Sequence, residues 1–86
     1  MRNIITAVNE NNNKIIIEIL LGFKIEEIGK EYVAYTINDD TLSEDVEVFI
    51  SEIDYNSSLP KIVPIKEDEK EIVLLFYNNI KKSIGI

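Results

Sequence analysis

Residues 14–24 read Lys-Ile-Ile-Ile-Glu-Ile-Leu-Leu-Gly-Phe-Lys, and this stretch decides the predicted fold. Its side chains alternate with a period of two. One face carries the apolar set Ile15, Ile17, Ile19, Leu21 and Phe23. The other carries the mixed set Ile16, Glu18, Leu20, Gly22 and Lys24. Alternation with repeated β-branched residues predicts a strand that packs on its odd-numbered face. A helix is the alternative, but the asparagine-rich flank and the repeated isoleucines count against it.

Turn signals lie on both sides of this strand. Residues 9–13 are mostly asparagine, which tolerates left-handed backbone, and they follow the short β-rich run 4–8. On the other side, residues 26–29 end in Gly29, and residues 30–37 are predicted to return as the second strand of a hairpin. Further strands are predicted at residues 46–54 and, as a short edge strand, 61–64, after loops at 38–45 and 56–60.

The C-terminal segment changes period and predicts an amphipathic helix. A stripe of apolar residues recurs about every four positions, namely Ile72, Phe76, Ile80 and Ile84, widened by Val73 and Leu75. Acidic residues crowd its start and Lys81 and Lys82 occupy its last turn, which complements the helix dipole. Asp68 and Glu71 have the spacing of a capping box, and Gly85 suits the C-terminal cap.

These elements predict one α+β domain over residues 1–86. We expect an antiparallel β-sheet meander of four to five strands, with one C-terminal amphipathic helix packed on one face. A chain of 86 residues has room for one core and a shallow groove, whereas a deep pocket would remove core that it needs.

Composition excludes several classes of function. Sixteen acidic residues against nine lysines and arginines give a formal net charge of −7, so we expect no direct binding to nucleic acid and none to an anionic membrane. The chain has neither cysteine nor histidine, which excludes disulfides, catalysis by a thiolate or an imidazole, and zinc sites built from cysteine and histidine. No signal peptide is visible, and the expected location is the cytoplasm.

Two groups of carboxylates could carry chemistry. Residues 38–45 form an acidic loop, but the spacing fails the calcium-binding loop pattern because Leu42 occupies a ligand position, so we expect a solvated turn and no metal. Glu18, Glu47 and Glu52 lie on predicted strands, where exposed charge is ordinary. We therefore expect neither a catalytic residue nor a cofactor.

Several segments resemble the YrzB-like family of small acidic bacterial proteins, also called domain of unknown function 1292. They are the Gly29-Lys30-Glu31-Tyr32-Val33 run, an acid-rich loop, Val46-Glu47-Val48, and Ile62-Val63-Pro64-Ile65 before the acidic residues 67–69. The chain departs from that family at residues 11–13, where three asparagines replace an expected acidic residue with glycine. The family has no established activity, so the resemblance implies no catalytic residues.

The leading hypothesis is a non-enzymatic interaction module, an adaptor or regulator that binds a protein partner or forms a homodimer. Tyrosine is frequent at interfaces, and the mixed face of the strand at 14–24 is too apolar for water. The predicted partner surface comprises Glu18, Leu20, Tyr32 and Tyr35. The alternative is an acidic mimic of nucleic acid that occupies the basic cleft of a nuclease or another nucleic-acid-binding protein.

Overall fold

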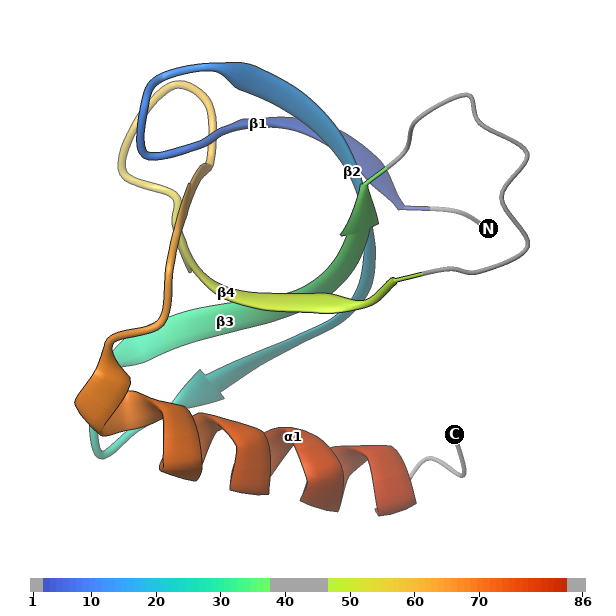
Figure 1. The fold of residues 1–86 in the computed structure, drawn as a ribbon, viewed down its shortest axis with the longest axis vertical. Coiled ribbons are helices and arrows are strands. Elements are labelled where there is room, and N and C mark those ends of the chain that lie inside the picture. Colours follow the sequence, from blue (N-terminus) through green and yellow to red (C-terminus); the bar gives the residue numbers. More distant parts are fainter. Residues whose placement is uncertain (1–2, 38–46, 84–86) are drawn as a thin grey trace.

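Five strands are followed by a single helix along the chain, and the computed structural model describes residues 3–37 and 47–83 (Figure 1). The elements are β1 (Ile4–Val8), β2 (Lys14–Ile25), β3 (Lys30–Ile37), β4 (Phe49–Asp54), β5 (Lys61–Val63), the 3₁₀ turn η1 (Glu67–Glu69) and α1 (Lys70–Ser83). The α+β class and a C-terminal helix are confirmed. Val46, predicted to begin β4, lies outside the described residues, as do the acidic loop, Ile84 and Gly85.

The sheet closes into a barrel in the order β1-β2-β3-β4-β5, which corrects the predicted open meander. Strands adjacent in sequence pair antiparallel, and β1 pairs parallel with β5 through Val8 and Lys61. The Val8 amide donates to the Pro60 carbonyl at 2.9 Å. With an odd number of strands, antiparallel steps leave the first and last strands parallel. Residues 61–63 therefore close the sheet and are not an edge strand.

A β-bulge at Leu20 divides β2 into two halves. Ile19 pairs with Tyr35, and Leu21 pairs with Ala34, so two steps along β2 match one step along β3. A bulge bends its strand and increases the local twist. The odd-numbered residues of β2 therefore pair with odd-numbered residues of β3 before the bulge and with even-numbered residues after it. The prediction that residues 15–23 share one odd-numbered face is corrected here.

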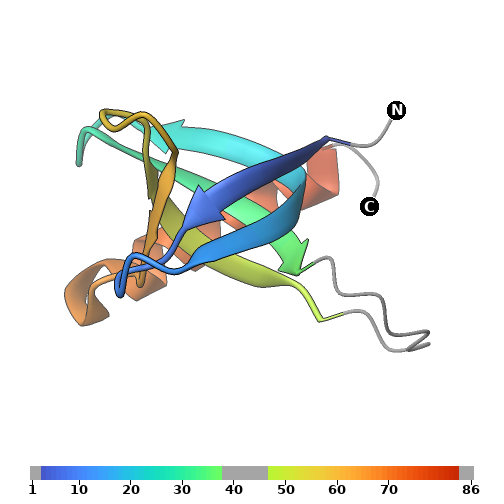
Figure 2. The same ribbon diagram turned by 90° about the horizontal axis from the view of Figure 1, so that it is seen from above.

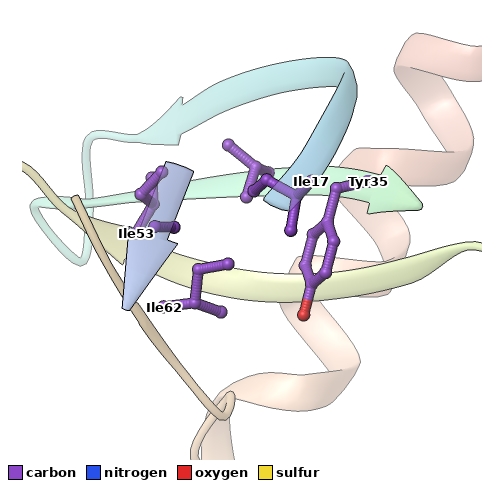
Figure 3. Close-up of a cluster of buried hydrophobic side chains, with 6 residues drawn as sticks. Ile17, Tyr35, Ile53 and Ile62 are labelled. Carbon is purple, nitrogen blue, oxygen red and sulfur yellow. The ribbon is translucent and has the colours of Figure 1, made fainter. Parts of the chain in front are cut away.

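The first half of β2 contributes to the core inside the barrel. Figure 3 shows Ile17, Tyr35, Ile53 and Ile62 meeting there, each from a different strand. Ala7 of β1 belongs to the same cluster and is fully buried. Removing each of these apolar side chains from water contributes to stability in proportion to its area. This core, and not the helix, covers the face that holds Ile15, Ile17 and Ile19.

A second core lies between the outside of the barrel and α1. Ile25 of β2, Tyr32 of β3 and Val73 of α1 are fully buried in it, and Ile72 and Phe76 pack against it. The predicted apolar stripe is thus confirmed at these helix positions. Its widening by Leu75 is wrong, since that side chain is 58% exposed.

The start of the helix differs from the predicted capping box. Asp68 lies within η1, preceded by Lys66, and no side chain caps that turn. Glu67 instead pairs with Lys70 at 3.0 Å, and α1 begins at Lys70. The acidic first turn and the lysines of the last turn remain as the dipole argument predicts.

Both predicted turns are confirmed, and the first also joins an antiparallel hairpin of β1 and β2. In the first, Asn12 has a φ of 64°, and the Asn9 side-chain oxygen accepts hydrogen bonds from the amides of Asn11 and Asn13 at 2.9 and 3.0 Å. Asparagine can therefore build this turn without the glycine of the resembled family. In the second, Gly29 has a φ of 77°, the conformation for which a glycine was expected.

Candidate interaction surface

Tyr35 does not lie on a surface. It is 7% exposed inside the barrel, where its hydroxyl lies 3.0 Å from the Ser51 Oγ and its ring stacks on Phe49 at 5.8 Å. The hydrogen bond satisfies two polar groups that would otherwise be buried without partners. Tyr35 is therefore a core residue, and its assignment to a partner surface is corrected.

Tyr32 is fully buried beneath the 3₁₀ turn, on the side of β3 opposite to Tyr35. Its hydroxyl donates to Glu69 Oε1 at 3.2 Å. Lys30 Nζ reaches the same carboxylate at 3.2 Å and Glu52 at 3.4 Å. Burial, reinforced by the charge of Glu69, raises the pKa of Tyr32 to about 12. Because of these contacts the four residues join η1 to the barrel, so Tyr32 too is not part of a partner surface.

Leu20 and Glu18 keep the positions that the alternation of β2 predicts. Leu20 is 50% exposed on the outside of the barrel, and Ile16 is 49% exposed on the same strand. Glu18 lies between them and is half-buried. β1 adds a third apolar side chain, because Ile4 pairs directly with Glu18 and is 42% exposed. We call Ile4, Ile16, Glu18 and Leu20 the outer patch.

The pairing register brings the members of the outer patch together. Ile4 and Glu18 are cross-strand partners, and Ile16 and Leu20 each lie two residues from Glu18 along β2. Diagonal neighbours of this kind are about 7–8 Å apart, within reach of long side chains. β1 and the first half of β2 form the side of the barrel away from α1, as Figures 1 and 2 both show. The outer patch is therefore separate from the second core, which lies between the barrel and α1.

The sequence carried a signal for Ile4 that the residue-by-residue prediction did not use. A turn over residues 9–13 is centred on Asn11, which places Ile4 opposite Glu18 if the hairpin pairs regularly. Likewise, Tyr32 and Tyr35 are separated by an odd number of positions on one strand, and period two sends such residues to opposite sides. Counting positions would have added Ile4 to the surface and separated the tyrosines.

A polar depression of about 280 Å³ lies at the C-terminal end of β4 and is lined by residues 29–31 and 52–56. Lys30 and Glu52, which line it, are already engaged with each other, and Asp54 accepts a hydrogen bond from the Asn56 amide at 2.9 Å. Burial, then the nearby charge of Glu31, raises the pKa of Tyr55 at its rim. Lys30, Glu52 and Asp54 therefore already have partners within the protein.

The carboxylates considered for catalysis are dispersed. Glu18 pairs with Thr36 of β3 whereas Glu52 pairs with Tyr32, four residues away on the same strand, which is about 13 Å at the rise of a β-strand. Within residues 3–37 and 47–83, no three acidic residues gather as a metal site would require. Over the same ranges, no helix is long and apolar enough to cross a membrane.

Comparisons with protein-family models, with curated proteins and with solved structures found no match to this chain. The resemblance to the YrzB-like family therefore stays a prediction.

Proposed function

We propose that this protein is a non-enzymatic interaction module that binds a protein partner through the outer patch. The observation that carries the proposal is the grouping of three half-exposed apolar side chains, Ile4, Ile16 and Leu20, around one carboxylate. Single exposed apolar residues are common on monomeric proteins, but a contiguous group with a polar member is typical of an interface. A cytoplasmic location, as expected from the absence of cysteine, completes the proposal.

The charge of the chain specifies the chemistry of the partner. With a net charge of −7, the protein repels a second copy of itself and attracts a basic surface. The outer patch supplies the apolar part of the contact through Ile4, Ile16 and Leu20. The favoured partner is therefore a protein whose contact surface combines apolar residues with basic ones. A homodimer is the less favoured outcome.

Affinity capture with matched baits tests this proposal. Leu20→Lys and Leu75→Lys make the same substitution at similarly exposed leucines, one in the outer patch and one on α1. In a lysate of the source organism, we expect wild type and Leu75→Lys to capture the same basic protein, and Leu20→Lys to capture at least about tenfold less, a loss of about 1.4 kcal/mol.

Three outcomes would contradict the proposal. They are equal capture by the two variants, loss of capture in Leu75→Lys alone, and absence of any specific partner. If light scattering instead shows a dimer that only Leu20→Lys disrupts, the surface is correct but the partner is a second copy. The nucleic-acid mimic would be favoured by a different result. In that case neither substitution changes capture, salt weakens capture steeply, and duplex DNA displaces the captured protein.

A further inference from the structure

The backbone of β1 has one edge that is bonded to β2, and among the described strands its other edge pairs only with β5, at Val8. The Ile19 amide donates to the Asn3 carbonyl at 2.8 Å, so the backbone groups of Asn3 face β2. The Val8 amide donates to Pro60 at 2.9 Å, so Val8 faces the other way. Successive residues of a strand alternate in this respect. The amide and carbonyl groups of Ile4 and Thr6 therefore point away from β2.

No described strand pairs with β1 beyond Val8 on that side. The parallel pairing begins at Val8 and Lys61, and β5 then runs on past the end of β1. Residues 4–7 therefore have no counterpart in β5. The side chains of Ile4 and Thr6 are both exposed. An open edge with aligned donors and acceptors is a template for another strand.

We propose that the partner binds by strand addition, with an extended segment pairing along the edge of β1 formed by Ile4–Ala7. The inference rests on the proposed function, since the same partner would cover the outer patch. A strand added here places every second side chain beside Ile4 and Thr6, on the face that carries Ile16 and Leu20. Backbone pairing supplies affinity, and the outer patch selects apolar side chains at alternate positions.

Charge selects a basic segment over a second copy of β1. Pairing β1 with its own copy would bring together two chains that each carry −7. Positive charge on the added segment removes that repulsion and adds attraction to the acidic chain. The expected occupant alternates apolar residues with lysine or arginine.

A synthetic peptide tests the mode of binding without the natural partner. The probe is the capped nonapeptide Lys-Val-Thr-Val-Lys-Val-Thr-Val-Lys, with two further versions that carry N-methyl groups on either the odd or the even residues. Methylation removes the donors along one edge of a strand only. We expect one methylated version to bind at least about tenfold more weakly than the other, as measured by calorimetry.

Amide hydrogen exchange reports the bound edge directly. In the free protein we expect fast exchange at Ile4 and Thr6 and slow exchange at Ile5 and Ala7, because only the second pair is bonded within the barrel. The probe should protect Ile4 and Thr6. Thr6→Pro removes the edge donor but no bond to β2, and we expect it to abolish this binding, whereas Thr6→Val should not.

The result that overturns strand addition is an absence of new protection at Ile4 and Thr6 with up to about 1 mM probe, where a Kd of 1 mM corresponds to about −4.1 kcal/mol. Equal affinity of the two methylated versions would also overturn it, even if Thr6→Pro fails to fold. If the probe fails while capture still depends on Leu20, the outer patch remains the partner surface and only the strand mode is wrong. If capture does not depend on Leu20, the proposed function itself fails.

Discussion

Tyr32 is held by contacts that a surface tyrosine would lack. Its ring stacks on Phe23 at 5.8 Å, and its hydroxyl shares Glu69 with Lys30. A buried phenol must stay neutral unless a cation compensates for the lost water, and here the nearest carboxylate makes ionisation harder still. Its acid–base behaviour is therefore coupled to the stability of the fold.

We expect that coupling to appear at alkaline pH. The pKa of Tyr32 is about 12 in the folded protein against 10.0 for an ordinary tyrosine, because burial and then Glu69 favour the neutral form. The folded pKa is raised, so the stabilising contribution is complete below pH 10 and is lost as the pH rises from about 10 to 12. Urea unfolding of wild type should show a falling midpoint over that range.

Tyr32→Phe is the matched control because phenylalanine cannot ionise. Contact with Glu69, and then Glu52, raises the pKa of Lys30, so Lys30 also loses stabilising charge at high pH in both proteins. The difference between the two urea profiles isolates the tyrosine. Parallel decline in wild type and variant would show that Tyr32 is not the titrating group.

At the scale of elements, the bulge in β2 determines what each half of the strand contacts. Before Leu20 the odd-numbered residues fill the barrel, and beyond it Phe23 and Ile25 meet the helix. One strand of twelve residues thus contributes to two cores. The helix packs over the second core, so truncating side chains on its buried face should lower stability more than truncating those on its exposed face.

Val73→Ala and Leu75→Ala test the orientation of α1. Val73 is fully buried against the barrel, so its truncation should lower the free energy of unfolding by about 1.5–3 kcal/mol. Leu75 is mostly exposed, and alanine is the best helix former, so the change there should stay within about 0.5 kcal/mol. Chemical denaturation measures both, and equal costs would mean that the helix packs on another face.

At the scale of the whole molecule, net charge opposes compactness. Nine lysines and arginines stand against sixteen carboxylates, and one of them, Lys30, already pairs with both Glu52 and Glu69. Surface ion pairs contribute little each, whereas repulsion acts among all the carboxylates. Screening by salt should therefore stabilise the folded state.

We expect the Tm to rise when NaCl is added to a low-salt buffer at neutral pH. The control is the double variant Glu10→Lys/Glu27→Lys, which changes two exposed residues in the hairpin turns. Each change adds two positive charges, so its net charge is −3 instead of −7 and its Tm should respond less. A Tm that falls with salt would indicate that ion pairs outweigh repulsion.

Local signals were enough to place most elements. Alternation identified the strands of both hairpins, the asparagines and Gly29 marked their turns, and the four-residue stripe located the helix. Each signal depends on contacts between residues near in sequence, which is why it can be read without a structure. The exposure of Leu20 followed from the same alternation.

The tertiary structure decided how these elements combine. Closure through Val8 and Lys61 joins residues 53 positions apart along the chain, and no local pattern specifies such a pair. The bulge at Leu20 moves the odd-numbered residues of β2 from the barrel interior to the side that faces the helix. Alternation carried across the bulge therefore misplaced Phe23. Closure also converts the face that was expected beneath the helix into the interior of a barrel, and with it Tyr35 into core. The sequence determined strands, turns, helix and charge because those depend on neighbours, whereas the barrel and the surface it leaves exposed depend on distant pairing.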